Sequence, residues 1–339
     1  MPYLLPILKP WGISLISALI LVPLLRFIAI KTHFVDMPSN RKVHARPLAL
    51  LGGVGIYLSF ALAVALSSTL GLPILGIVTG AGLLMILGLI DDRYGMNPWI
   101  KILGQATAAA IVIACGVSVQ FLDLPYLNVA FTLLWMIGIT NSFNLLDNMD
   151  GLSAGVAFIS AVAFAAITAR FLFLGQEQIE ALVIAAALSG ACLGFLRYNL
   201  YRASIFMGDA GSMVLGFVLA SIAALGSWHS ATITTSILIP VLILAYPIFD
   251  TTFVTLLRLL RGVPFYRGGK DHSSHRLVNL GLSKLEAVLL IYLFCLTHAL
   301  AAFLVSSVTF RLALMAFFMS GCTLFIFGMV LRKAPLDDR

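Results

Sequence analysis

Residues 141–151 read Asn-Ser-Phe-Asn-Leu-Leu-Asp-Asn-Met-Asp-Gly, and they interrupt an apolar sequence with two amides and two carboxylates spaced three residues apart. Residues three apart are neighbours on a helix surface, but over nine residues such a row winds halfway round the helix. Asn141 and Asp150 can therefore share a face only if the helix tightens or ends, and Asp150-Gly151 is typical of a helix end. Four polar side chains at a helix terminus beside hydrocarbon indicate a binding site.

The composition around this stretch is that of a polytopic membrane protein. Of the 339 residues, 61% are hydrophobic and only 10% are charged, against about 25% charged residues in soluble domains. We find no polar block long enough to be a soluble domain, so we predict one membrane domain over residues 1–339. The four cysteines lie in apolar runs without the spacing of metal ligands, which favours packing roles.

Apolar segments predict the number of membrane crossings, because a spanning helix needs about 20 mostly apolar residues. The segments that qualify are 11–30, 51–70, 73–90, 100–118, 127–143, 152–174, 179–196, 211–228, 233–257, 285–305 and 310–331. The sequence therefore predicts an all-α integral membrane protein with about eleven transmembrane helices and with its chain ends on opposite sides of the bilayer.

The distribution of lysine and arginine predicts the orientation, because cytoplasmic loops carry an excess of both. With eleven helices, all of them except Lys9, Arg170 and Arg311 lie on one side. We therefore place the N-terminus outside and expect the active site on the cytoplasmic face. The predicted cytoplasmic loops are about residues 31–50, 91–100, 144–151, 197–210 and 258–284. Most acidic residues fall on the same side, which the positive-inside rule does not require and a shared reaction centre would explain.

The first cytoplasmic loop and the helix after it carry groups suited to anions. Lys42 and His44 lie in a loop stiffened by prolines, where cations around a histidine suit contact with an anion. The alternative interpretation is an anchor beside lipid headgroups. Gly52-Gly53 lets the backbone come close to a neighbour or a ligand.

Two further cytoplasmic motifs are acidic. Asp91-Asp92 ends an apolar helix, where adjacent carboxylates repel and are disfavoured unless they are paired or bound to metal. This pair favours Mg²⁺ or a proton acceptor. Asp209 begins a helix and is either an ordinary N-cap or part of a loop that binds phosphate together with Mg²⁺. Asp250, two turns inside a later helix, is left open between structural pairing and function.

The last cytoplasmic loop is basic and contains two histidines three residues apart. His272 and His275 lie next to cations that include Arg276. They could bind a metal, but zinc usually requires softer ligands nearby, so we favour phosphate contact. A basic rim around an acidic centre suits a polyanionic substrate that binds through Mg²⁺.

Four motifs in this order resemble those of the polyprenyl-phosphate N-acetylhexosamine-1-phosphate transferases. They are Asp91-Asp92, Asn144-x-x-Asp147-x-x-Asp150-Gly151, Gly208-Asp209-Ala210-Gly211-Ser212 and Lys270-Asp271-His272-x-x-His275-Arg276-Leu277. The resemblance extends from about Val35 to Leu282. It implies a Mg²⁺-dependent enzyme, with Mn²⁺ as an alternative ion, that transfers N-acetylhexosamine 1-phosphate from a UDP-sugar to undecaprenyl or another polyprenyl phosphate and releases UMP.

The resemblance also implies a place in the cell and roles for individual residues. The enzyme would lie in the plasma (inner) membrane and catalyse the first membrane step of a cell-surface glycan, such as lipopolysaccharide or teichoic acid. Asp209 would be the metal ligand, with Asp150 as a second ligand, and Asp91 the base or nucleophile with Asp92 beside it. The predicted substrate contacts are Lys42, His44, Asn144, Asp147, Asp150, Asn199, His272, His275 and Arg276.

Three alternatives remain from the sequence: another branch of the same family, a secondary transporter and a receptor. The stretches 41–47 and 272–276 look more like the WecA/TagO branch of the family than the related MraY branch, the phospho-N-acetylmuramoyl-pentapeptide transferases, so UDP-N-acetylglucosamine is the default donor. Asn148 and Ala49-Leu50 depart from the family pattern and bear on the choice of sugar. The other two are a secondary transporter, whose acidic groups would usually lie near the midplane between repeats, and a receptor that only binds nucleotide sugars. No nucleic-acid partner is expected, and a homodimer is left open.

Overall fold

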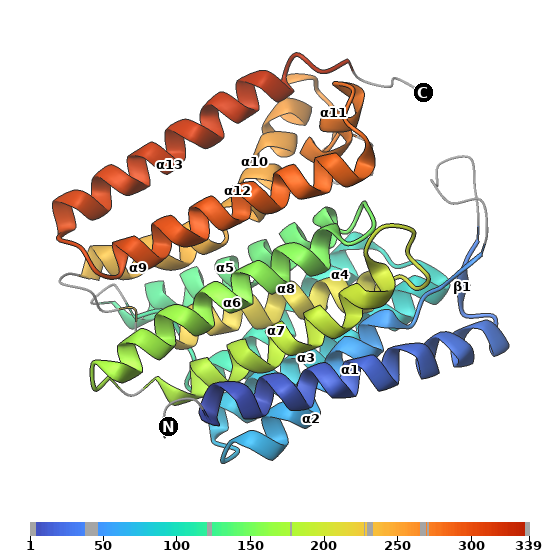
Figure 1. Ribbon diagram of the computed structural model, residues 1–339, viewed down its shortest axis with the longest axis horizontal. Helices are drawn as coiled ribbons and strands as arrows, with labels where there is room; N and C mark the ends of the chain where they lie inside the picture. Colours follow the sequence, from blue (N-terminus) through green and yellow to red (C-terminus); the bar gives the residue numbers. More distant parts are fainter. Residues whose placement is uncertain are drawn as a thin grey trace. The chain divides into compact units, whose positions relative to one another are not determined.

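A computed structural model describes residues 5–37, 47–120, 124–176, 178–226, 228, 233–264, 269 and 271–335 (Figure 1). The chain forms two compact units, unit 1 over Met1–Gly226 and unit 2 over Ser227–Arg339. The single membrane domain expected from the sequence stays a prediction.

The described part of unit 1 consists of helices and one very short hairpin. Its elements are α1 (Leu5–Lys31), β1 (Val35–Asp36), β2 (Leu48–Ala49), α2 (Gly52–Ser67), α3 (Leu72–Tyr94), α4 (Pro98–Ala114), α5 (Pro125–Leu146), α6 (Leu152–Phe173), α7 (Ile179–Asn199) and α8 (Gly208–Leu225). The two strands pair antiparallel, with Val35 opposite Ala49. Strands of two residues are too short to show an alternating pattern, so the sequence did not reveal them.

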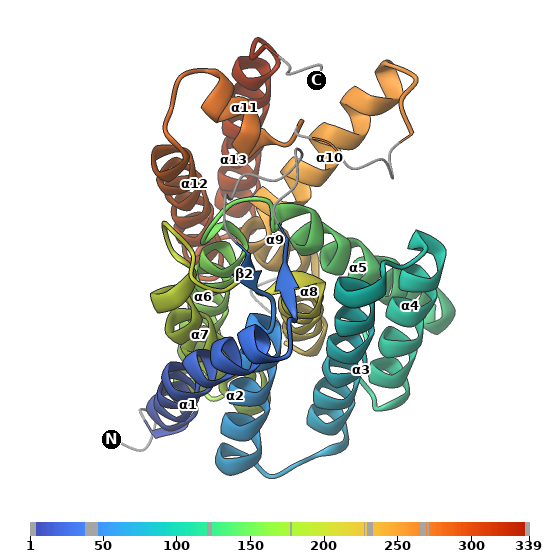
Figure 2. The same cartoon turned by 90° about the vertical axis from the view of Figure 1, so that its right-hand side faces the viewer.

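Helix α8 forms the core of unit 1. Residues 210–224 of this helix are all buried, and the helix packs mainly against α3 and α5, with α2, α6 and α7 also in contact (Figure 2). Small residues, among them Gly211, allow neighbouring helices to approach closely. The backbone N–H groups of Gly52 and Gly53 donate to the carbonyls of Phe206 and Met207, each over 3.0 Å. Gly52-Gly53 therefore approaches another segment of the chain, which is one of the two roles predicted for it.

Unit 2 contains a broken helix pair and two long helices. Its elements are α9 (Ile233–Ile243), α10 (Ala245–Leu260), α11 (Ser273–Asn279), α12 (Lys284–Val305) and α13 (Phe310–Leu331). Phe327 of α13 packs with tilted rings against Phe294 of α12 and Phe249 of α10, with ring centroids 4.3 and 5.7 Å away. The short helix α11 lies inside the predicted loop 258–284, which is therefore partly helical.

Every segment predicted to span the membrane is helical over most of its length. Within the described residues, eight helices are long and apolar enough to cross a bilayer, and the pair α9 and α10 makes a ninth if it counts as one span. Helices α2 and α4 have only 16 and 17 residues, or about 25 Å at the α-helical rise, which is less than a hydrocarbon core of about 30 Å. The all-α membrane architecture is confirmed, whereas the eleven crossings and the orientation stay predictions.

One predicted span was wrong in detail, because residues 233–257 form two helices rather than one. Helices α9 and α10 bend by 73° at their break. Pro247 lies in the first turn of α10, where it has no backbone N–H to donate to the preceding turn. Proline is a common cause of such a kink.

The approach of α2 to α8 gives a test of the packing. A Cβ on Gly53 would lie 2.2 Å from the backbone nitrogen of Gly211. We expect Gly53→Ala to push the helices apart and to lower the free energy of unfolding by about 1–3 kcal/mol, the usual cost of overpacking. Thermal unfolding in detergent measures this change.

Gly138→Ala in α5 is the matched control, because a Cβ there would have no described atom within 4 Å. Alanine is a better helix former than glycine by about 0.5–1 kcal/mol, so this variant should be slightly stabilised. A Gly53→Ala protein as stable as the Gly138→Ala protein would contradict the close packing of α2 on α8.

Candidate active site

The polar stretch 141–151 spans the end of α5 and the turn into α6. The row of polar residues is broken by a helix end, as predicted, but α5 ends at Leu146 rather than at Asp150-Gly151. Gly151 has a φ of 76° and precedes the first residue of α6. This left-handed conformation favours glycine and allows the chain to reverse within five residues. Asp147 and Asp150 therefore lie in the turn beyond the end of α5.

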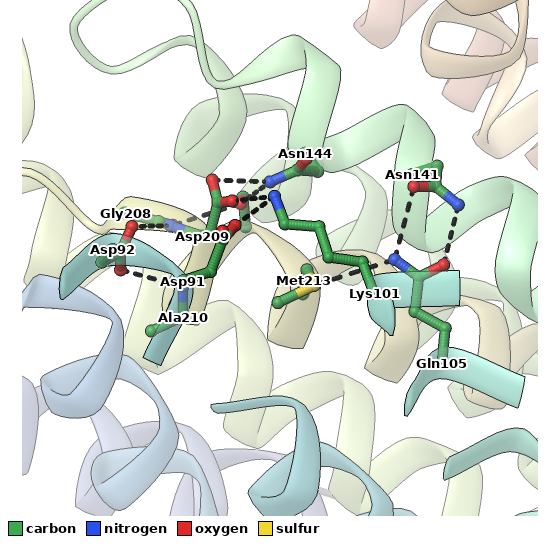
Figure 3. A network of polar contacts seen from close by, with 11 residues as sticks. Asp91, Asp92, Lys101, Gln105, Asn141, Asn144, Gly208, Asp209, Ala210 and Met213 are labelled. Carbon is green, nitrogen blue, oxygen red and sulfur yellow. Dashed lines mark hydrogen bonds and ion pairs between the residues drawn. The ribbon is translucent and has the colours of Figure 1, made fainter. Parts of the chain in front are cut away.

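Asn141, the first residue of the row, faces α4 and pairs with Gln105. Its Nδ2 donates to the Oε1 of Gln105 over 2.8 Å, and the Nε2 of Gln105 donates back to its Oδ1 over 3.3 Å. Figure 3 shows this pair on one side of the polar network. The two amides satisfy each other, so Asn141 belongs to the packing of α4 on α5.

Asp209, in the first turn of α8, lies at the centre of the network (Figure 3). The Nδ2 of Asn144 donates to the Oδ1 of Asp209 over 2.9 Å and to the Oγ of Ser212 over 3.0 Å. The ammonium group of Lys101 forms ion pairs with Oδ2 of Asp209 and with Oδ2 of Asp91. Four helices, α3, α4, α5 and α8, therefore place two carboxylates, an amide and an ammonium group together.

The side chain of Asp92 binds two backbone N–H groups at the start of α8. Its Oδ1 accepts a hydrogen bond from the backbone nitrogen of Asp209 over 2.9 Å, and its Oδ2 accepts one from Ala210 over 3.3 Å. The first N–H groups of a helix have no partner within the helix, and a carboxylate is favoured at this end by the helix dipole. Gly208 has a φ of 65°, and a Cβ there would lie 2.3 Å from Oδ2 of Asp92. Glycine is therefore required at this position.

Asp150 and Asn199 connect the turn after α5 to the segment before α8. Asp150 accepts a hydrogen bond from the backbone nitrogen of Ala203 over 2.9 Å. Asn199, only 4% exposed, accepts one from Gly151 over 3.0 Å and donates to the carbonyl of Ile205 over 2.9 Å. Both polar atoms of the Asn199 amide are thus engaged with backbone, so its geometry is that of a residue that fixes two loops.

Asp147 lies in an acidic environment between these groups. Burial raises the pKa of its carboxyl well above the ordinary value, and the negative charges of Asp209, Asp92 and Asp150 raise it further. Like charges disfavour the ionised form of a carboxylic acid. A cation near Asp147 would relieve that repulsion.

The basic motif of the loop predicted over residues 258–284 lies in unit 2. Arg258 forms two hydrogen bonds with the carboxylate of Asp271, of 2.6 and 2.8 Å. Burial alone would raise the pKa of Asp271, but this guanidinium holds it below the ordinary value. Arg276 is 1% exposed, and its guanidinium donates to the carbonyls of Asp271 and Leu331. This arginine fixes the loop.

The two predicted histidines differ in exposure. His275 is partly exposed, whereas His272 is buried and pairs with Asp250. Lys42 and His44 lie outside the described residues.

Comparison with known proteins identifies the family of the chain. Residues 74–227 match the model of glycosyl transferase family 4. A protein of Bacillus subtilis (strain 168), named a probable undecaprenyl-phosphate N-acetylglucosaminyl 1-phosphate transferase, is 36% identical over 316 residues, which are 90% of this chain and 87% of that protein. The decaprenyl-phosphate N-acetylglucosaminephosphotransferase of Mycolicibacterium smegmatis is 32% identical over 90% of this chain and 81% of its own length.

The chain belongs to glycosyl transferase family 4. A more distant relative, the undecaprenyl-phosphate alpha-N-acetylglucosaminyl 1-phosphate transferase of Escherichia coli (strain K12), is 28% identical over 79% of this chain and 75% of its own length. The resemblance drawn from the motifs is confirmed, and the protein is a transferase with several apolar helices of membrane-spanning length.

Lys101 belongs to the polar network around Asp209, and the sequence analysis did not select it. It was counted only among the charges that set the orientation. It is the one charged residue in the 17 residues of α4, and an ionisable group in an apolar helix is a functional signal in its own right. Its partner Asp209 lies 108 residues further along the chain. The sequence could therefore show that Lys101 is unusual but could not predict its partner.

The residues around Asp209 fit a magnesium ion. Mg²⁺ prefers oxygen ligands and is usually held by one or two carboxylates together with substrate phosphates and water. Among the described residues, no three His, Cys, Asp or Glu side chains form a closed metal cage. The carboxylates of Asp91 and Asp209 nevertheless converge on a cation, the ammonium of Lys101. Asp209 is thus well placed as the predicted ligand, and the geometry adds Asp91 beside it.

The raised pKa of Asp147 gives a test of its environment in the metal-free enzyme. Above about pH 4, the usual pKa of aspartic acid, the unfolded chain releases this proton while the folded protein retains it. The carboxyl therefore destabilises the fold progressively as pH rises. We expect Asp147→Asn, measured in EDTA, to raise the melting temperature at pH 7 more than at pH 4. Equal changes at both pH values would contradict the acidic environment.

Proposed function

We propose that the protein transfers N-acetylhexosamine 1-phosphate, by default N-acetylglucosamine 1-phosphate, from a UDP-sugar to undecaprenyl or a related polyprenyl phosphate and releases UMP. The convergence of Asp91 and Asp209 on the Lys101 ammonium, with Asn144 bonded to Asp209, carries this proposal. It provides a cation site for a diphosphate next to a carboxylate that can accept a proton. The names of the relatives support the polyprenyl phosphate acceptor and the N-acetylglucosamine group.

The proposed reaction is a phosphoryl transfer at the β-phosphorus of the UDP-sugar. An oxygen of the lipid phosphate forms the new bond to this phosphorus, and the bond to the bridging oxygen breaks, so that UMP leaves. Such reactions mainly need alignment and neutralisation of charge. Mg²⁺, held by Asp209 with Asp91 or Asp150, would neutralise the charge of the diphosphate.

The residues around Asp209 have separate tasks in this proposal. Asp91 accepts the remaining proton of the lipid phosphate when that group is not fully ionised. Lys101 holds Asp91 and Asp209 side by side and carries a positive charge for phosphate oxygens. Asn144 keeps the carboxylate of Asp209 in place. Asp92, whose two oxygens bind backbone, serves as a positioning residue rather than as a base.

The other residues from the sequence analysis have proposed roles as well. Asp147 and Asp150 are proposed to hold the nucleotide sugar or the metal, and Asn199 fixes the turn that carries them. Lys42, His44, His272 and His275 are proposed contacts of the donor, and Arg276 maintains the loop that presents the histidines. A plasma-membrane location, with the reaction on the cytoplasmic face, follows from the need to join a soluble nucleotide sugar to a lipid.

The main test is an assay of the purified enzyme with undecaprenyl phosphate, Mg²⁺ and a panel of UDP-sugars. We expect UMP release and a lipid-linked product, greatest with UDP-N-acetylglucosamine and abolished by EDTA. Asp209→Asn should lower kcat/KM by about 10³-fold, in line with the loss of a group that stabilises transition-state charge. The matched control is Asn141→Gln, which alters a neighbouring amide pair outside the centre. Release of no UMP with any donor would exclude this function.

A second experiment separates direct attack from a covalent aspartyl intermediate. We favour direct attack, because a phosphate monoester has its second pKa at about 6 and is largely doubly ionised near neutral pH. The nucleophile therefore needs little activation by Asp91. Enzyme, Mg²⁺, UDP-sugar and labelled UMP are incubated without lipid, and label in the UDP-sugar is measured. We expect no exchange, and rapid exchange of label would rule out direct attack.

A further inference from the structure

A buried carboxylate in unit 2 has a specific geometry that the proposed chemistry has not used. Asp250 of α10 is 1% exposed. Its Oδ2 lies 2.9 Å from the Nδ1 of His272, and its Oδ1 accepts a hydrogen bond from the backbone nitrogen of Ser273 over 2.8 Å. The sequence left the role of Asp250 open, and these two bonds define it.

The surroundings hold His272 in one orientation. His272 is itself 4% exposed and directly precedes the first residue of α11. The hydroxyl of Tyr246 lies 2.5 Å from the Oγ of Ser273, so α10 contacts the start of α11 through two side chains. On the other side, Asp271 is fixed by Arg258. The backbone on both sides of His272 is therefore held, and the imidazole has little freedom to rotate.

The hydrogen-bond chemistry of this pair selects one tautomer of the ring. An ionised carboxylate can only accept hydrogen bonds, whereas a neutral imidazole has one donor nitrogen and one acceptor nitrogen. Nδ1 must therefore carry the proton that bonds to Asp250, and Nε2 is left as the acceptor. Among the described residues, no other hydrogen bond of the His272 ring is found. Because Nδ1 binds Asp250, Nε2 is the ring nitrogen left to accept a hydrogen bond from a ligand.

We propose that Asp250 is a positioning residue that fixes His272 as the Nδ1–H tautomer and presents Nε2 to the sugar nucleotide donor. This inference rests on the proposed function, which supplies the donor. A carboxylate that orients a histidine in this way is a general device for making one ring nitrogen available. A metal site does not explain the pair, because no third ligand of the described chain joins it. A purely structural cap of α11 would need only the bond to Ser273.

The substitution Asp250→Asn distinguishes these roles, because an amide presents one acceptor and one donor. The Oδ1 of the new asparagine can keep the bond to the backbone nitrogen of Ser273. Its NH₂ group then faces Nδ1 of His272, which must act as an acceptor. The variant therefore satisfies the helix start but forces the proton of the ring onto Nε2. A carboxylate-to-amide change at a histidine in a serine protease acts in the same way.

The experiment combines a spectroscopic and a kinetic measurement on the full-length protein in nanodiscs. ¹⁵N-histidine NMR at pH 8 reports which nitrogen of each of the six histidines carries the proton, and His272→Asn identifies the signals of His272. We expect Asp250→Asn to exchange the two ¹⁵N signals of His272 and to lower kcat/KM for the UDP-sugar by about 10²-fold. The melting temperature should change little. An unchanged tautomer would overturn the proposal.

Two further variants test whether Asp250 acts through His272. Tyr246→Phe removes the hydroxyl contact to the same helix start and leaves Asp250 intact, so the tautomer should be retained. In His272→Asn, the shorter amide can still donate to Asp250 but lacks Nε2. If Asp250 works only by orienting His272, the double variant Asp250→Asn/His272→Asn should be no less active than His272→Asn. Additive losses would overturn the positioning role.

The outcomes also separate this inference from the function on which it rests. If the wild-type enzyme releases no UMP with any UDP-sugar, the proposed function fails, whatever the NMR spectrum shows. If the wild type is active but His272 carries its proton on Nε2, the function stands and the role of Asp250 is rejected.

Discussion

The site in unit 1 depends on the hydrogen bonds made by the backbone N–H groups at the partly buried N-terminus of α8. A helix that starts inside a protein leaves backbone N–H groups without partners, and leaving them unpaired is costly. Asp92 provides two of the missing acceptors from α3. These two hydrogen bonds from α3 therefore fix the position of Asp209, which follows Gly208. Packing and chemistry are linked at this point, because the contact that stabilises the core also places the central carboxylate.

The acidic motifs divide into residues that bind backbone and residues that face one another. Asp92, Asp150 and Asn199 engage main-chain groups and set the path of the loops. Asp91 and Asp209 instead meet at Lys101. The two adjacent residues of the Asp91-Asp92 motif therefore differ in role: Asp92 binds backbone, and Asp91 pairs with Lys101. The same division holds in unit 2, where Arg258 and Arg276 hold the loop that carries His272.

The sequence revealed the features that local chemistry determines. Long apolar runs became helices. Asp91 was selected because carboxylates beside hydrocarbon need a partner or a metal, Asp147 because it lies in the polar row 141–151, and Asp209 because it begins a helix between glycines. The sequence did not predict contacts between residues that are far apart along the chain. Lys101 and Asp250 could be recognised as unusual but not paired, since their partners come from other helices. The early end of α5 was missed because Asp147 and Asn148 are compatible with either a helix or a turn, and Gly151 decides only where the next helix begins.

The hairpin before α2 has a consequence for variation within the family. The strands β1 and β2 close the ends of the intervening segment, and the carbonyl of Ala49 accepts a hydrogen bond from Phe206 over 2.8 Å, near the start of α8. Residues added or removed between the strands leave this closure intact, and the entropy of closing a loop grows slowly with its length. Evolution can therefore lengthen or rewrite that segment to suit a new substrate while the framework around Asp209 is inherited unchanged.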